Sequence, residues 1–244
     1  MSRRRAVLAL LGFVVVATCA SLGAWQLNRL ADRRALNDRL IAREALPVAE
    51  AATLEMRGGR ADPAAYRRVR ATGVFDVSQE VVLRARPLNG RPGNHVLTPL
   101  RLGDGSAIVV NRGWVPLRMD EPGAAEAAPP ASQVTVTGIL VPSEPAPVVF
   151  GPRDPATGRL ATIGRIDLER LRAQIPYSIA PLAIAMESQQ PSHAALPEPA
   201  GRPPPGEGPH LAYAVQWFIF AVIALVTTAL LMRREREAAA SPSA

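Results

Sequence analysis

The 244-residue sequence contains no lysine, one cysteine and three histidines. Cys19 has no second cysteine with which to form a disulfide or a Cys-x-x-Cys redox or copper site, so thiol chemistry is excluded. His95, His193 and His210 are far apart along the chain, and a zinc site built from them would need an unusual supply of carboxylates. The few candidate ligands therefore argue against a protein metal cluster.

Motifs that mark common enzyme active sites are also absent. The sequence has no glycine-rich loop followed by a lysine, no Gly-x-Ser-x-Gly turn, and no histidine near a nucleophile and an orienting acid. Six aspartates stand singly beside turn residues, where aspartate is commonly structural: Asp62, Asp76, Asp104, Asp120, Asp154 and Asp167. We therefore expect a protein that is not an enzyme, although catalytic pairs formed only by folding are invisible in a sequence.

Basic residues outnumber acidic ones, with a net charge of +7 and a pI near 11.0. Residues 1–5 carry +3, and the tail from Arg233 carries three arginines against two glutamates, or +1, which leaves +3 for the rest. In that remainder 22 arginines are interleaved with 19 acidic residues and few aromatic ones, a pattern typical of a solvated surface. Without a basic stripe or a stacking platform, we expect no nucleic-acid partner.

Two uncharged runs, residues 6–28 and 211–232, dominate the hydropathy pattern. Each reaches the roughly 20 residues that a helix needs to cross about 30 Å of hydrocarbon. The first run could instead belong to a cleaved signal peptide, but it is longer than a typical signal. We therefore expect two spans in contact with membrane lipid.

Arginine placement predicts the topology. Arg3, Arg4 and Arg5 precede the first span, and three more arginines follow the second, which places both termini in the cytoplasm, or in the matrix for a mitochondrial protein. Arg29 and its basic neighbours after the first span argue the other way, but long loops cross membranes largely regardless of charge. The predicted organisation is a cytoplasmic N-terminus (1–5), a first span (6–28), an extracytoplasmic domain (29–190), a proline-rich tether (191–209), a second span (210–232) and a cytoplasmic tail (233–244).

The patterning of the outer domain predicts an α+β fold built on an antiparallel sheet or small barrel. A charged helix is expected at 29–45 and a short one at 167–175, capped by Asp167 and ended by Pro176. Predicted strands cover residues 67–74, 80–86, 96–102, 107–112, 133–141 and 182–186. Gly103-Asp104-Gly105 predicts a hairpin turn. The alanine- and proline-rich segment 121–132 is expected to be a loose insertion, and 191–209 an extended tether.

Arg112 and Trp114 form the most interesting pair in the outer domain. A guanidinium and an indole around Gly113, at the end of an apolar strand, suit a protein interface or a carboxylate-bearing ligand. The alternative is a core tryptophan whose indole N–H is satisfied inside the domain. The two interpretations remain open, with Arg112 and Trp114 as candidate interface residues.

Each span carries a stripe at helical spacing. Thr18, Ser21, Trp25 and Arg29 share one face of the first span, and the second span has the stripe His210, Ala214, Trp217, Ala221 and Thr228. Small residues on a face allow a helix or a flat macrocycle to approach closely. We expect the spans to pack together, with Trp25 and Trp217 near the outer interface.

His210 is an ionisable side chain at the start of the second apolar run, where such groups are costly and often functional. Pro209 suits the first turn of a helix, whose positive end favours a neutral imidazole with a lone pair to donate. A neutral imidazole is a good ligand for haem iron. The alternative is an interfacial histidine hydrogen-bonded to backbone or headgroups.

Three motifs together resemble the surfeit locus protein 1 family of cytochrome c oxidase assembly factors. They are LGAWQLNR at 22–29, NRGWVP at 111–116 and GPHLAYAVQWF at 208–218, supported by Tyr66, Gly73, Phe75 and Thr98-Pro99-Leu100. The resemblance covers nearly the whole chain in order. It implies a bacterial plasma-membrane or mitochondrial inner-membrane protein that assists insertion of haem a into subunit I of the oxidase, with haem A synthase as a further partner. In bacterial members the histidine matching His210 is implicated in binding haem a.

Three hypotheses follow. The first is a chaperone that receives haem a between its spans, with His210 as the iron ligand and Trp25 and Trp217 beside the cofactor. The second is a haem-free scaffold that stabilises an oxidase assembly intermediate through Arg112, Trp114 and Arg29. The third, a haem-modifying enzyme, ranks last because the sequence offers no proton-transfer or redox partner near His210.

Overall fold

The computed structural model describes residues 3–145, 154–192, 195–201 and 206–240. The chain divides into a helical unit, Met1–Arg39 with Pro205–Ala244, and a β-rich unit, Leu40–Pro204. His193, one of the three histidines, lies outside the described residues.

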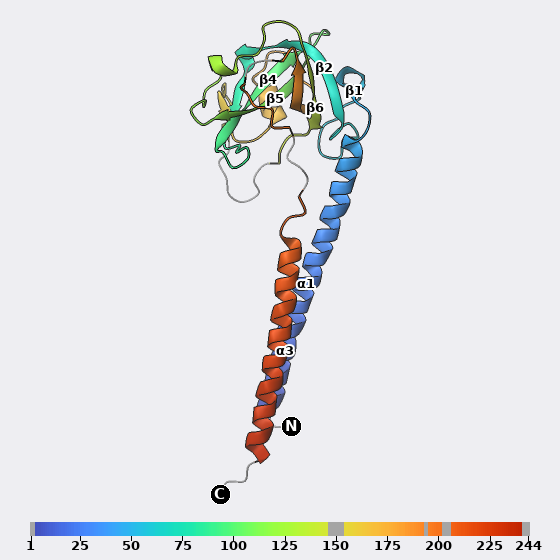
Figure 1. Ribbon diagram of the computed structural model, residues 1–244, viewed down its shortest axis with the longest axis vertical. Coiled ribbons are helices and arrows are strands. Elements are labelled where there is room, and N and C mark those ends of the chain that lie inside the picture. The colour runs from blue at the N-terminus through green and yellow to red at the C-terminus, as the bar shows by residue number, and fades with distance from the viewer. Residues whose placement is uncertain (1–2, 146–153, 193–194, 202–205, 241–244) are drawn as a thin grey trace. The chain divides into compact units, whose positions relative to one another are not determined.

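The helical unit contains the two helices that the apolar runs predict. Helix α1 covers Arg3–Glu44 and α3 covers His210–Ala240, and each contains a stretch long and apolar enough to cross a membrane (Figure 1). The charged continuation expected at 29–45 is confirmed, since α1 runs without a break to Glu44. Its alanine, leucine and arginine residues favour helix, and no proline occurs before Pro47.

Small residues bring α1 and α3 into direct contact along antiparallel paths. A Cβ atom added to Gly23 would lie 2.8 Å from the Phe218 ring, and one added to Gly12 would overlap the Thr228 side chain. Ala214 is 1% exposed for the same reason. The expected packing of the spans is confirmed, and the first residues of α1 lie at the same end of the pair as the last residues of α3 (Figure 1).

The two predicted packing stripes have different outcomes. The second-span stripe, His210, Ala214, Trp217, Ala221 and Thr228, is the buried or half-buried side of α3. The first-span stripe is wrong as a packing face, since the side chain of Trp25 is exposed and none of its members is buried. The buried side of α1 instead carries Cys19, Gly23, Leu30 and Asn37, because glycine at position 23 permits the closest approach.

The β-rich unit is built on a closed barrel. Its strands are β1 Ala49–Glu50, β2 Arg68–Phe75, β3 Val81–Leu83, β4 Gly93–Arg101, β5 Ala107–Pro116, β6 Val134–Val141, β7 Thr162–Ile163 and β8 Ala183–Gln190. The ring order is β2-β6-β8-β5-β4, closed by pairing of β2 with β4. A ring of five strands cannot alternate direction throughout, and β5 and β8 form the parallel pair. The expected small barrel is thus confirmed, with this one departure from antiparallel pairing within the ring.

Local signals in the β-rich unit are also confirmed. The β4–β5 hairpin turns at Gly103-Asp104-Gly105, where Gly105 has a φ of 85° and Asp104 accepts from the Ser106 amide at 2.9 Å. Helix α2 covers Leu168–Arg172, and the Asp167 carboxylate caps it by accepting from the Arg170 amide at 3.0 Å.

Two hydrophobic cores fill the β-rich unit. The barrel interior is lined from all five ring strands, for example by Val69, Leu100, Val110, Leu140 and Ile184. A second core lies between the outer side of the barrel and the layer made by β3, β7 and α2; its members include Leu83, Leu97, Val109, Ile163 and Leu171. Alternate residues of β4 and β5 thus face different cores.

Two segments that composition predicts to be loose contain described residues with defined contacts. In the predicted loose insertion 121–132, a short 3-10 helix, Ala125–Ala127, packs Ala127 against Val96 and Val115. In the predicted tether 191–209, Glu198 exchanges backbone hydrogen bonds with Trp114 at 2.8 and 2.9 Å. Sequence composition missed both because alanine- and proline-rich chains can dock through a few buried contacts.

Candidate functional site

His210 begins α3, and one contact defines its chemistry. Its Nδ1 lies 2.9 Å from Gln26 Oε1 on α1. An amide oxygen only accepts hydrogen bonds, so Nδ1 carries the proton and Nε2 of the neutral ring carries the lone pair. Among the described residues, no hydrogen bond occupies Nε2. The imidazole is therefore held in the tautomer that can donate its Nε2 lone pair to a metal.

The chain entering α3 leaves the Nε2 edge of His210 uncovered. Gly208 has a φ of 73°, and a Cβ at that position would lie 3.4 Å from Cδ2 and 3.5 Å from Nε2 of the ring. Any other residue would be strained there and would place atoms against the lone pair. The Gly-Pro-His order thus combines a turn, a helix start and an open ligand edge.

The other expected residues of this site lie on different sides of the helix pair. Trp25 is 52% exposed and lies beside Arg29, whose guanidinium carbon is 5.9 Å from the ring centroid. Trp217 is half-buried and meets Phe220 edge-on at 5.9 Å. Only Trp217 shares the stripe of His210. Gln26, which does touch His210, belongs to the motif at 22–29, but sequence reasoning missed it because the helical stripe through Trp25 excludes it.

Arg112, expected at an interface, lies inside the barrel. It is 0% exposed because it follows Ile108 and Val110 on the side of β5 that faces the barrel interior, and a bulge follows directly: Leu97 pairs with Asn111 and Val96 with Gly113, which leaves Arg112 without a partner residue on β4. Its Nη1 donates to Glu80 at 3.3 Å. Burial lowers the pKa of the guanidinium to about 10, against the opposing effect of Glu80. Arg112 is thus placed as part of the barrel core, away from the surface.

Trp114 lies beneath the segment that ends the β-rich unit. It is 7% exposed, with the Arg91 guanidinium carbon 4.3 Å from its ring centroid and Arg91 paired to Glu198 at 2.5 Å. Glycines at 93 and 113 permit these approaches, since a Cβ on Gly113 would overlap the Glu198 carbonyl oxygen. The geometry matches a packed tryptophan, covered here by Arg91 and Glu198, but the expected satisfied indole N–H is not found: Trp114 Nε1 is buried without a hydrogen-bond partner among the described residues.

The fold and the site together define a class of protein in which two helices long and apolar enough to cross a membrane flank a β-barrel unit in the sequence, and the second helix begins with an oriented imidazole. The model of the SURF1 family matches residues 13–222, and the chain belongs to that family. This interval takes in Gln26, the barrel and His210.

Similar proteins support the assignment. An "uncharacterized SURF1-like protein" of Mycobacterium tuberculosis is 28% identical over 228 residues, covering 91% of this chain and 82% of its own length. A "SURF1-like protein" of Rickettsia felis is 25% identical over 88% of this chain and 91% of its own. "Surfeit locus protein 1" of Takifugu rubripes is 29% identical over 52% of this chain and 58% of its own.

Proposed function

We propose that this chain is an assembly factor for cytochrome c oxidase that binds haem a through His210 and assists its insertion into subunit I. It acts in a bacterial plasma membrane or the mitochondrial inner membrane, with both termini on the cytoplasmic or matrix side and the barrel outside. Subunit I and haem A synthase are its partners. Family membership supports the assembly role. The arginines before the first span and after the second span support the orientation with both termini on the cytoplasmic or matrix side.

The observation that carries the haem proposal is the Gln26–His210 hydrogen bond. It selects the Nε2 lone pair, and Gly208 leaves that atom uncovered. Metal-bound histidines commonly donate their other ring N–H in this way, which fixes the ring orientation. When bound, haem a would supply an iron centre that the His210 imidazole would hold through Nε2.

The packing of the helices changes where the cofactor is proposed to lie. Gly23 meets Phe218 directly and Ala214 is buried, so the helices leave no room for a macrocycle between them at that level. We place haem a on the exposed side of the pair at His210, and Trp25 is not part of this proposal. Binding of moderate strength suits a carrier that must release its cargo.

The test is the haem content of the full-length protein purified from cells that make haem A. The His210→Ala variant is expected to lose the haem absorbance band, because it removes the imidazole that is the proposed iron ligand. Leu211→Ala, at an exposed neighbouring position, is the matched control and should retain it. Both variants are compared at equal abundance and equal helical content.

Equal haem content in the wild type and His210→Ala would overturn the ligand assignment. Oxidase activity of the same cells then separates the two functions: activity that survives in His210→Ala cells but not in cells lacking the protein supports a haem-free scaffold. Turnover of haem by the purified protein would instead indicate an enzyme.

A further inference from the structure

A pocket of 250 Å³ lies at one end of the second core, within the β-rich unit. Its apolar lining comes from Leu83, Val141, Pro142, Ile166 and Ala185, and its polar lining includes His95, Asn111, Arg60 and Arg86. Side chains of the second core leave this end unfilled. Its volume suits a ligand somewhat smaller than those in typical drug-sized pockets of roughly 300–1,000 Å³.

One polar group that lines the pocket, the Nε2–H of His95, has no hydrogen-bond partner among the described residues. Asn111 Oδ1 accepts from the Gly113 amide at 3.2 Å, which turns its Nδ2 toward His95 Nδ1 at 3.0 Å. An amide nitrogen only donates, so Nδ1 accepts and the ring proton lies on Nε2. That Nε2–H is buried without a hydrogen-bond partner among the described residues. An acceptor oxygen in the pocket would remove the cost of leaving this buried donor unpaired.

Charge in the pocket also favours an acceptor-bearing ligand. Arg86 is already paired with Glu144 at 2.5 Å, whereas Arg60 makes no hydrogen bond or ion pair within the described part of the chain. These three groups leave one uncompensated positive charge. Burial, with a contribution from the Arg86 charge, lowers the pKa of His95 to about 4, so the ring stays a neutral donor at neutral pH.

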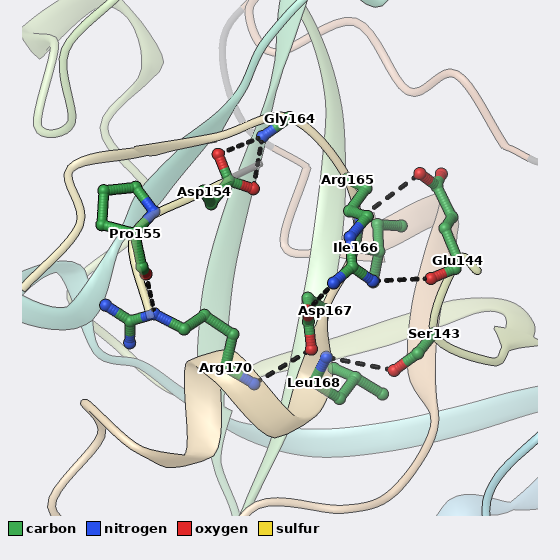
Figure 2. Close-up of polar contacts among 10 residues, drawn as sticks. All are labelled: Ser143, Glu144, Asp154, Pro155, Gly164, Arg165, Ile166, Asp167, Leu168 and Arg170. Carbon is green, nitrogen blue, oxygen red and sulfur yellow. Dashed lines mark hydrogen bonds and ion pairs between the residues drawn. The ribbon is translucent and has the colours of Figure 1, made fainter. Parts of the chain in front are cut away.

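One side of the pocket is formed by Ser143, Glu144 and Ile166, and hydrogen bonds join the two chain segments that carry these residues. Figure 2 shows Arg165 donating to the Glu144 carbonyl at 2.9 Å, and the Leu168 amide donating to Ser143 Oγ at 3.1 Å. Asp167, which follows Ile166, caps the start of α2 and so fixes the chain that leaves the pocket. The described residues 143–144 and 165–168 on this side of the pocket are therefore joined by hydrogen bonds, which suits a preformed binding site.

We propose that this pocket binds a small monocarboxylate with an apolar body, such as an aromatic or short-chain acid. The carboxylate accepts from His95 Nε2–H and pairs with Arg60, and the apolar body lies against Leu83, Val141 and Ile166. Water could satisfy one donor, but it gains little from apolar walls. This site is separate from His210 and does not depend on haem binding.

The test uses the full-length protein in lipid nanodiscs, with 15N-labelled histidine and 3-phenylpropionate as the probe. Binding is expected to shift one imidazole Nε2 signal, which is assigned to His95 by its absence in His95→Phe. Both His95→Phe and Arg60→Gln should raise the Kd at least tenfold. Arg57→Gln, an exposed arginine of the same segment that pairs with Glu55 outside the pocket, is the matched control and should bind like the wild type.

The second part of the test measures whether the pocket prefers the carboxylate to an uncharged analogue. The uncharged 3-phenylpropanamide should bind at least tenfold more weakly than the acid, and empty nanodiscs correct for partition into lipid. An unchanged Kd in Arg60→Gln, or a His95 signal that does not move on adding the acid, would overturn the proposal and leave a pocket that holds only water. Because Arg60 is exposed, Arg60→Gln should fold and still tests the proposal even if His95→Phe does not fold.

Discussion

The two described histidines have opposite chemistry because each has a different amide partner. Gln26 presents an oxygen to His210 Nδ1, which leaves a lone pair on Nε2. Asn111 presents an NH₂ group to His95 Nδ1, which leaves a proton on Nε2. One ring is thereby suited to a metal ion and the other to an anion or carbonyl oxygen.

Gln26 is predicted to position His210 without touching the cofactor. Replacing it with leucine removes the acceptor of the His210 Nδ1 proton, so the proton can move to Nε2. The affinity for haem a should then fall by about 10–100-fold, as it does when metal-binding histidines lose such a hydrogen bond. Haem titration of the purified apoprotein measures the effect, and Asn28→Leu, on an exposed position of α1, serves as the control. An affinity equal to that of the wild type would show that the hydrogen bond has no role in binding.

His95 should make the stability of the barrel depend on pH. Its pKa is lowered to about 4 in the folded protein from the ordinary value of 6.5, so the unfolded chain binds the proton more tightly. Stability therefore falls as the pH drops below about 6.5, by about 2 kcal/mol at pH ~5 for this group alone, and is constant above that range. Urea unfolding midpoints between about pH 5 and 7 measure the slope. The slope should flatten in His95→Asn, and an undiminished slope would assign it to other groups.

At the scale of elements, the β5 bulge decides what the surrounding residues do. The extra residue shifts the pairing of the residues that follow Arg112, while Gly113, with a φ of 123°, lets the backbone of Glu198 pair with Trp114. The residues around Glu198, after β8, thus form an antiparallel bridge with the end of β5 and cover its edge there.

Gly113→Ala is predicted to detach this covering segment. The added Cβ would overlap the Glu198 carbonyl oxygen and the backbone conformation would be strained, so the Trp114–Glu198 hydrogen bonds should open. Hydrogen exchange should then speed up at least tenfold at the amides of Trp114 and Glu198. Gly103→Ala, where an added Cβ meets nothing within 4 Å, should leave exchange unchanged. Equal protection in both variants would contradict the role of the glycine.

At the scale of the whole molecule, the helical unit depends on small residues more than on polar contacts. Gly12 and Gly23 allow close packing, and ion pairs such as Arg4–Glu235 at 3.1 Å are largely exposed on the arginine side and contribute little. The pairing also brings Gln26 from α1 to His210 on α3. Helix packing is therefore a precondition for the orientation of the imidazole.

Engineered cysteines test this pairing in membranes. In a Cys19→Ala background, Gly12→Cys with Thr228→Cys should form a disulfide readily under mild oxidation, because the two positions meet in the structure. Phe13→Cys with Thr228→Cys is the control, since Phe13 is 70% exposed, and it should not cross-link. Adding Gly23→Leu to the first pair should reduce the yield several-fold, and an unchanged yield would show that Gly23 does not govern the contact.

Features set by short-range physics could be predicted from the sequence. Run length alone predicts both spans, the Gly-Asp-Gly turn predicts the hairpin, and Asp167 predicts its helix cap, because each depends on neighbours within a few residues. The stripe on α3 was also predictable, since one small-residue face stands out there. On α1 two faces compete, and the aromatic one is the wrong choice.

By itself, the sequence determined the two membrane-length helices, the β-rich unit between them and His210 as the chemically distinctive residue. Tertiary structure alone decided that five strands close into a ring that buries Arg112, that β5 bulges beside it, and that Gln26 and Asn111 set the tautomers of two histidines. The physical reason is that closure, bulge placement and hydrogen-bond partners join residues separated by tens to nearly two hundred positions. Local propensity and periodicity carry no information about such pairs.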